Sequence, residues 1–226
     1  MSRYLTPILA VPKVVFFPNA SLPFYIADPN YLRMIQDSLD SGTPVTVSLA
    51  VPLSRLPNGH TQYVPREIAT VGKPLLLESG PEGGIKILMR GISRVRILRV
   101  VQHLPYLVAE VETIPDKEEG ILCENKIERL HNLFKNWIGQ SLINPQEKDF
   151  FLNQTSSIQE VLDYLSMFLV QDYEVKQLLL ECDSPLERIH MLDSLLIGNK
   201  YYLENTQSAA AIKYFEIIDK ISKTAC

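Results

Sequence analysis

Cysteine is scarce, and long apolar runs are absent. The 226 residues include three cysteines, at positions 123, 182 and 226, and no Cys-x-x-Cys pair. So few and so widely spaced, they predict neither a disulfide framework nor a cysteine-rich zinc site, and they favour a reducing compartment. No uninterrupted apolar run reaches the ~18 residues of a membrane helix. Because Pro7 and Pro12 interrupt the apolar stretch after Arg3, no secretory signal is recognised. We expect a cytoplasmic protein with no membrane partner.

The motifs of nucleotide, metal and acyl-transfer chemistry are also missing. The sequence has no G-x-x-x-x-G-K-[ST], no G-x-G-x-x-G and no G-x-S-x-G. None of the histidines, at 60, 103, 131 and 190, belongs to an H-x-x-x-H or H-E-x-x-H pair. A cysteine nucleophile would need a histidine brought close to it by the fold. We therefore expect no catalytic residues, no nucleotide, no metal and no other cofactor.

Charge is distributed unevenly along the chain. The net charge is −4, with +3 in residues 1–115 and −7 in residues 116–226. This asymmetry predicts two units with different surfaces. The overall acidity, with a pI of about 5.6, disfavours a protein whose affinity comes mainly from phosphate contacts.

Residues 1–115 have the pattern of a β-rich unit. Apolar and β-branched runs separated by turn signals predict strands at 7–12, 44–50, 67–77, 85–89, 95–101 and 107–114. The alternation slips at Ile97 and Leu98, which indicates a bulge that would suit a sheet curling into a barrel. Asp28 followed by Pro29, with Gly42 beyond, predicts one short helix between these strands.

Residues 116–226 have the pattern of four or five packed helices. Asn144, Ser157 and Ser184 each stand three residues before a Glu, as capping residues do at the start of a helix. Apolar stripes at helical spacing follow Ser157 and Ser184, and a third stripe runs from Ile127 to Ile138. The change from strand to helix pattern near 115–120 predicts the boundary between the two units.

A basic cluster lies in the second half of the β-rich unit, at residues 86, 90, 94, 96 and 99. Arg94 and Arg96 share one face of a strand, and Glu110 and Glu112 share a face of the next one. The pattern favours a cross-strand ladder of opposite charges. The alternative is an anion or RNA site.

Aromatic residues and prolines concentrate in residues 16–25, between a strand and the short helix. Phe16, Phe17, Leu22, Phe24 and Tyr25 are the apolar members. One interpretation is that they fill the end of the core. The other is that they form a partly exposed apolar surface for extended peptides, since exposed aromatic patches mark interaction sites.

Five ordered matches resemble one known family. The run Val14-Val-Phe-Phe-Pro-Asn-Ala-Ser-Leu-Pro-Phe24 resembles the start of the Lon protease N-terminal domain. Further matches follow in the same order at 67–72, 84–97, 106–111 and 178–192, so that the resemblance covers about residues 5–197. Gly91, Arg94 and Arg188 stand at positions that the family pattern specifies, and we expect structural roles for them. At Gly91 we expect a close approach that a Cβ would obstruct.

The resemblance implies a PUA-like β-barrel with one short helix at residues 1–115, followed by a helical bundle at residues 116–226, an α+β architecture. It also implies contact with unfolded or extended polypeptide or with a partner protein, and the aromatic segment at 16–25 is our predicted peptide-binding site. No position matches the ATPase or peptidase residues of Lon, so we expect a non-catalytic, stand-alone member that acts as an adaptor or regulator linked to proteolysis. The alternative function is an RNA-binding PUA-like module.

Overall fold

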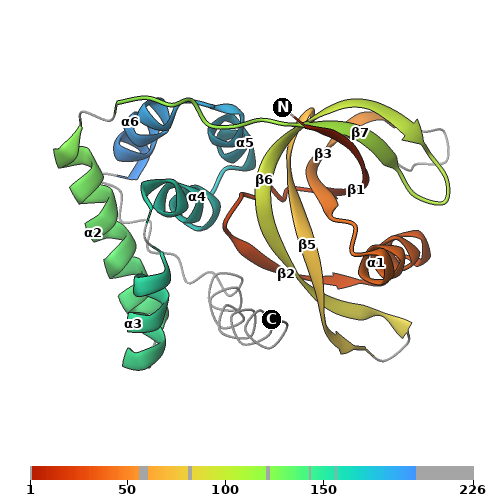
Figure 1. Cartoon of the computed structure of the whole chain (residues 1–226), viewed down its shortest axis with the longest axis horizontal. Helices are drawn as coiled ribbons and strands as arrows, with labels where there is room; N and C mark the ends of the chain where they lie inside the picture. The colour runs from red at the N-terminus through yellow and green to blue at the C-terminus, as the bar shows by residue number, and fades with distance from the viewer. Residues whose placement is uncertain are drawn as a thin grey trace. The chain divides into compact units, whose positions relative to one another are not determined.

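The computed structural model describes residues 2–55, 61–80, 83–120, 123–142, 144–155 and 157–196. His60 and Cys226, considered above for metal or thiol chemistry, lie outside these ranges. The strands are β1 (Arg3–Pro12), β2 (Ser21–Ile26), β3 (Val45–Arg55), β4 (Thr61–Pro65), β5 (Ile68–Ser79), β6 (Ile85–Gln102) and β7 (Val108–Thr113). The helices are α1 (Pro29–Ser41), α2 (Glu124–Ser141), α3 (Pro145–Gln154), α4 (Ile158–Phe168), α5 (Tyr173–Glu181) and α6 (Pro185–Leu196). The chain thus combines a mixed sheet with helices (Figure 1).

The chain divides into two compact units. The sheet unit consists of residues 1–18 and 24–115, and the helical unit consists of residues 19–23 and 116–226. One division falls after Pro115. The assignment of residues 19–23 to the helical unit has no counterpart in the sequence pattern. Whether each unit is a domain that folds alone stays a prediction.

The strands of the sheet unit are ordered β1-β7-β6-β5-β3-β4, and β2 pairs with β6. Strand β1 also pairs with β3 in parallel, through Ile8 to Pro12 against Thr46 to Ala50. The pairings of β1, β7, β6, β5 and β3 therefore follow one another in a closed circuit. These strands contribute a core cluster of buried apolar side chains: Ile8, Ala69, Val71, Val95, Ala109 and Val111.

Strand β6 differs from its prediction. The sequence pattern predicts two strands on either side of Gly91, whereas the structure has one continuous strand from Ile85 to Gln102. Glycine interrupts a hydrophobic pattern without ending the ladder, because it keeps both of its backbone hydrogen-bonding groups. The irregularity predicted at Ile97 and Leu98 is confirmed, since the register with β7 shifts between Ile97 and Arg99.

The predicted helix starts are confirmed. The Asn144 side chain accepts from the Gln146 amide at the start of α3. Ser157 and Glu160 form a reciprocal capping box at the start of α4, and the Ser184 hydroxyl accepts from the Glu187 amide in α6. Asp28 caps α1, which ends at Gly42 with a φ of 70°. Local capping chemistry therefore defines these boundaries.

In the helical unit, α2, α4 and α6 pack on one another (Figure 1). An aromatic cluster fills the space among α2, α3 and α4, and consists of Phe134, Trp137, Phe151, Tyr164 and Phe168. Neighbouring ring centroids in it lie 5.3–6.1 Å apart, as in favourable aromatic pairs. In the part of the chain that the structure describes, no helix is both long and apolar enough to span a membrane.

Candidate functional site

The first aromatic residues of the 16–25 segment are core residues. Phe16 and Phe17 are 1% and 0% exposed, so neither offers a surface to a peptide. The hydroxyl of Thr70 donates a 2.5 Å hydrogen bond to the Phe16 carbonyl. A Cβ at Gly91 would overlap the Phe17 carbonyl oxygen, and it would lie 3.0 Å from the Cα of Pro18. The close approach expected at Gly91 is therefore present, and the core-filling interpretation describes these two phenylalanines.

Tyr25 is the exposed aromatic residue of the segment. Its side chain is 61% exposed, although it contacts the turn between β5 and β6. A Cβ at Gly84 would overlap the Tyr25 hydroxyl, and one at Gly80 would lie 3.3 Å from its Cε2. The Gly80 amide donates a 2.7 Å hydrogen bond to the Gly84 carbonyl, which fixes the two glycines relative to each other. Gly80 and Gly84 thus contact one side of the Tyr25 side chain, and the rest of that side chain is exposed to solvent.

The other two predicted site residues differ in exposure. Leu22 is buried, at 6% exposed, whereas Phe24 is half-buried. Both belong to β2, which pairs with β6 and with no other strand among the described residues. The sequence pattern predicts a loop here, because the prolines at 18 and 23 interrupt any alternation. Proline is compatible with a strand at the edge of a sheet, and β2 has this position.

Residue 19 is bound to the helical unit, of which it is part. The side-chain amide of Asn19 donates a 2.9 Å hydrogen bond to Oδ2 of Asp163 in α4. The hydroxyl of Tyr164 donates a 3.2 Å hydrogen bond to the Asn19 carbonyl. Two consecutive residues of α4, Asp163 and Tyr164, therefore bind Asn19. Asn19 has a φ of 61°, which asparagine tolerates better than most residues.

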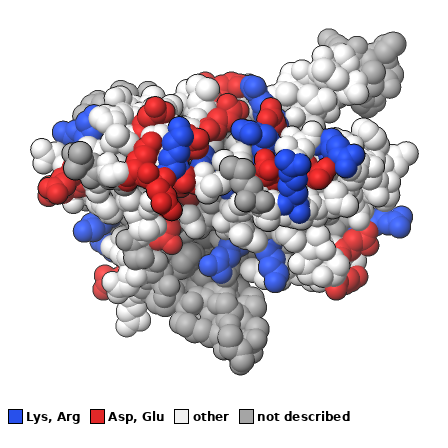
Figure 2. Space-filling view, turned by 45° about the horizontal axis from the view of Figure 1, so that its top comes forward, with Lys and Arg blue, Asp and Glu red and all other residues white. Residues whose placement is uncertain are grey.

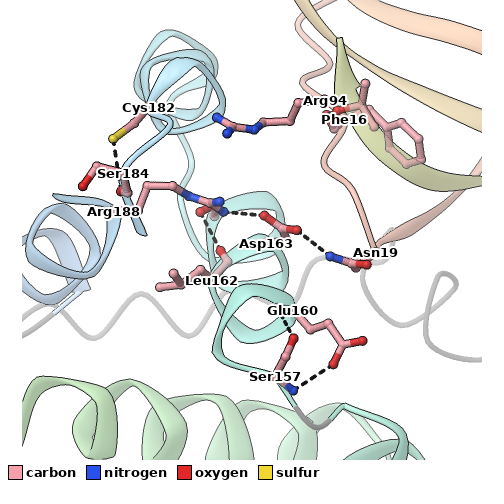
Figure 3. Close-up of polar contacts among 12 residues, drawn as sticks. Phe16, Asn19, Arg94, Ser157, Glu160, Leu162, Asp163, Cys182, Ser184 and Arg188 are labelled. Atoms are coloured by element: carbon pink, nitrogen blue, oxygen red, sulfur yellow. Dashed lines mark hydrogen bonds and ion pairs between the residues drawn. The ribbon is translucent and has the colours of Figure 1, made fainter. Parts of the chain in front are cut away.

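Asp163 lies between Asn19 and Arg188 of α6 (Figure 3). Asp163 and Arg188 are both almost fully buried, and the Nη2 of Arg188 donates to Oδ1 of Asp163. Burial raises the pKa of the Asp163 carboxyl to about 6, while Arg188 and the hydrogen bond from Asn19 oppose this increase. Arg188 therefore pairs with the carboxylate that α4 buries.

Carboxylates pair with most of the basic cluster. Arg96 contacts Glu67 at 3.0 Å, Arg99 contacts Glu110 at 2.7 Å, and Lys86 contacts Glu78 at 3.2 Å. On the face shown in Figure 2, basic and acidic side chains are interspersed. Since a site for phosphates requires unneutralised positive charge, this arrangement supports the ladder and not the anion site.

The partners in the ladder differ from those predicted. Glu112 pairs with Arg3 of β1 at 3.1 Å, and Arg94 is not part of the exposed ladder. Arg94 is 4% exposed, and its Nη2 donates to the Pro115 carbonyl at 3.4 Å. The bulge after Ile97 brings Arg99, not Arg94, beside Glu110. The sequence pattern showed the bulge but not the change of partners.

The described residues offer no group of three or more histidine, cysteine or acidic side chains suited to a metal ion. Cys182 has its sulfur 3.5 Å from the Glu187 carboxylate, and its burial raises the pKa of the thiol. A thiol held in its neutral form is a poor nucleophile. This environment does not support thiol catalysis at Cys182.

Sequence reasoning missed Asn19, Asp163 and the pair Gly80 and Gly84. One signal for Asp163 was available, because it is a carboxylate surrounded by apolar residues throughout the stripe of α4. A charge at such a position needs a buried partner. No signal in the sequence connects Asn19 with α4, which lies about 140 residues further along the chain.

Relatives of this chain are Lon proteases. It is 24% identical over 200 residues to Lon protease of Buchnera aphidicola subsp. Schizaphis graminum, covering 86% of this chain and 25% of that protein. It is 25% identical over 202 residues to Lon protease of Dictyoglomus thermophilum, covering 88% of this chain and 25% of that protein. The chain therefore spans about a quarter of the length of these relatives.

Two solved structures share the fold. The Lon N-terminal domain protein from Xanthomonas campestris superposes with a TM-score of 0.58 at 21% identity, covering 84% of this chain and 96% of that one. The N-terminal domain of the Mycobacterium avium complex Lon protease has a TM-score of 0.58 at 20% identity, with the same coverage of both chains. The family model for the ATP-dependent protease La (LON) substrate-binding domain matches residues 6–197. This chain accordingly belongs to the Lon substrate-binding domain family.

Proposed function

We propose that this chain binds extended polypeptide segments through an apolar surface of the sheet unit centred on Tyr25, and that it does so without nucleotide or metal. The observation that carries the proposal is membership of the Lon substrate-binding domain family over residues 6–197. The described residues add an exposed aromatic side chain in the segment that the sequence had singled out. Phe16 and Phe17 are no longer part of the proposed contact surface, because they are buried.

The contact of Tyr25 with Gly80 and Gly84 supports its role as an anchor for the peptide. Aromatic anchors contribute most when their orientation is fixed before binding, since less rotamer entropy is then lost. Contact with Gly80 and Gly84 restrains the Tyr25 side chain on one side. The remaining 61% of its surface is open to a ligand. Phe24, half-buried next to it in sequence, extends the apolar character of the strand.

The edge position of β2 supports an extended ligand. Because β2 pairs only with β6 among the described strands, the backbone groups on its other side have no strand partner there. An extended peptide can add to such an edge by main-chain hydrogen bonds, which recognise any sequence. The aromatic side chains would then add affinity for apolar segments.

The finer architecture and the role in the cell are part of the same proposal. The closed circuit of strand pairings supports a PUA-like barrel, and the packing of α2, α4 and α6 supports a helical bundle that begins after residue 115. A non-catalytic adaptor or regulator linked to proteolysis, acting in the cytoplasm, fits a polypeptide-binding module of this family.

The test is fluorescence anisotropy with a labelled unfolded polypeptide and a labelled single-stranded RNA, each at two salt concentrations. We expect micromolar binding of the polypeptide that persists at the higher salt, because apolar contacts are not screened. Tyr25→Ala should weaken that binding about ten- to a hundredfold, the equivalent of burying one aromatic side chain. Binding of the RNA alone, abolished by salt, would replace this function by the RNA-binding alternative.

Tyr63→Ala is the matched control. Tyr63 lies in β4 of the same unit and is 47% exposed, so its removal subtracts a comparable aromatic surface. Equal losses of affinity in the two variants would show that the surface at Tyr25 has no special role. Circular dichroism and the melting temperature of each variant establish that the fold is unchanged.

A further inference from the structure

The helical unit has a small groove at the end of α4, the start of α5 and the end of α6, with a volume of about 240 Å³. Helix α4 packs against both α5 and α6 (Figure 1). The volume is below the ~300–1,000 Å³ of small-molecule sites, so the groove suits one or two apolar side chains. We call it the α4–α6 groove, and its apolar lining consists of Leu169, Val170, Val175, Leu195 and Leu196.

Hydrogen bonds fix the backbone around this groove. Asp172 caps α5, and its Oδ1 accepts from the amides of Glu174 at 2.8 Å and Val175 at 3.0 Å. At the end of α4, the Leu169 amide donates a 3.0 Å hydrogen bond to the Leu165 carbonyl. The groove is therefore formed before any ligand arrives, and little binding energy is lost in ordering it.

The sequence beyond the described residues contains an amphipathic segment at residues 208–223. At about 100° per residue, the helical angle, its apolar residues gather on one face and its five charged residues on the other. A helix of this length is marginal in water by itself, so its apolar face requires a surface to cover it. The apolar face consists of Ala210, Ala211, Tyr214, Phe215, Ile217, Ile218 and Ile221.

The segment is within reach of the groove. Leu196 lines the groove and is the last residue that the structure describes. Residues 197–207, which separate it from the segment, can extend to about 36 Å, more than the ~30 Å diameter of a small domain. A linker of this length gives an effective concentration in about the millimolar range, so even weak docking within one chain is favoured over association between chains.

Charge also favours this occupant. Residues 116–196 contain 7 Lys and Arg against 15 Asp and Glu, whereas residues 208–223 contain three lysines against two acidic residues. Asp172, at the groove itself, has an exposed side chain. Opposite net charges therefore attract the segment to the helical unit.

We propose that the α4–α6 groove is the docking site of residues 208–223 of the same chain, whose apolar face fills it. Val175 and Leu195, which are half-buried in the groove, are covered by the docked segment. The docking is independent of the polypeptide binding proposed above, because that binding uses the sheet unit.

Two pairs of variants test the docking. Ile218→Ser removes a member of the apolar face, and Ile212→Ser is its control, because Ile212 lies among the charged residues of the segment. Val175→Phe fills the groove with a larger side chain. Leu178→Phe is the control on the same helix, because Leu178 is exposed and lies outside the groove. If Val175→Phe does not fold, the isoleucine pair decides by itself.

The first measurement is hydrogen–deuterium exchange in the full chain. Amides of residues 208–223 should exchange at least about tenfold more slowly than those of an unstructured peptide. Loss of one buried isoleucine should weaken docking about ten- to a hundredfold, so Ile218→Ser should raise the exchange accordingly, whereas Ile212→Ser should not. An unprotected segment in the wild type, or equal effects of the two serine variants, would overturn the proposal.

The second measurement locates the docked segment. A spin label on Cys226, attached after the other two cysteines are replaced by serine, should broaden the backbone NMR signals of Val175 and Leu195. Ile218→Ser should restore these signals. Broadening on another surface instead would contradict the assigned site. Broadening that occurs only between a spin-labelled chain and a separate isotope-labelled chain would identify a second copy as the occupant, and would equally overturn the proposal.

Discussion

Gly72 and Gly91 are partners across β5 and β6, and the chain at Phe16 to Pro18 lies against both of them. A Cβ at Gly72 would lie 3.1 Å from the ring of Phe16 and 2.7 Å from the Arg90 carbonyl oxygen. A Cβ at Gly91 would overlap the Phe17 carbonyl. The missing side chains of this pair therefore make room for the segment that carries the predicted site, and they explain why its first two aromatic residues enter the core.

Substitution at Gly91 should be costly because the obstructing atoms belong to the backbone. Gly91→Ala should lower the free energy of unfolding by about 2 kcal/mol, and Gly91→Val by more, since a carbonyl group cannot move aside as a side chain can. Urea denaturation gives the values. Gly120→Ala is the control, because a Cβ there would have no neighbour within 4 Å. Similar midpoints for Gly91→Ala and Gly120→Ala would contradict the steric argument.

Substitution at Gly84 should affect binding more than stability. A Cβ at Gly84 would displace the Tyr25 hydroxyl, which is the end of a flexible side chain and can move into solvent. We expect Gly84→Ala to change the free energy of unfolding by less than about 1 kcal/mol. Because Tyr25 is no longer restrained by its contact with residue 84, polypeptide binding should weaken about fivefold or more in anisotropy titrations. If Gly84→Ala displaces Tyr25 and still binds polypeptide with the wild-type affinity, the role of Tyr25 as an anchor is contradicted.

Stability should depend on pH through Asp163. The folded chain holds a proton on this carboxyl up to about pH 6, whereas the unfolded chain loses it near the ordinary value of 3.8. The folded state therefore binds more protons between about pH 4 and pH 6, so the free energy of unfolding should decrease as the pH rises through this range. Above about pH 6 this contribution is constant. Urea denaturation at several pH values measures the slope.

Asp163→Asn should remove this slope, whatever its effect on absolute stability through the loss of the partner of Arg188. Glu128→Gln, which neutralises an exposed carboxylate on α2, is the control and should leave the slope in place. A slope that persists in Asp163→Asn would assign the pH dependence to another group.

Lys176 of α5 should destabilise the fold at neutral pH. Its burial lowers the pKa of the ammonium group to about 8, from an ordinary value of 10.5. The unfolded chain therefore binds more protons between these values, and the free energy of unfolding should increase as the pH rises from about 8 to 10.5. Lys176→Met should raise stability at pH 7 by more than about 1 kcal/mol and abolish this dependence. Lys135→Met, at an exposed position on α2, should do neither.

Local chemistry explains what the sequence predicted well. The capping side chains of Asp28, Asn144, Ser157 and Ser184 accept hydrogen bonds from amides within three residues, so these helix starts can be predicted from neighbouring residues in the sequence. The slip at Ile97 and Leu98 is a local break in alternation, and it marks a real shift of register. The strand β2 was missed because prolines obscure its pattern, and a pattern cannot tell an edge strand from a loop.

Exposure within the 16–25 segment was decided by the tertiary structure. Phe17 and Tyr25 are similar aromatic residues eight positions apart, yet one is 0% exposed and the other 61%. The difference arises because Phe17 lies against Gly91, whereas Tyr25 lies on a turn with solvent on its other side. Hydrophobicity in the sequence shows that such residues need a contact, but not whether the contact is the core or a ligand.

Inspection of the residue order is enough to recognise the family, the β-rich and helical halves, the helix starts and the absence of nucleotide and metal-binding motifs, because each of these depends on residues close together in the chain. Three features become visible once the chain is folded: Asp163 contacts both Arg188 and Asn19, residues 19–23 group with the helices, and each arginine faces a particular carboxylate. These contacts join residues from 11 to 144 positions apart. Such pairings depend on how elements pack, and no local periodicity encodes them.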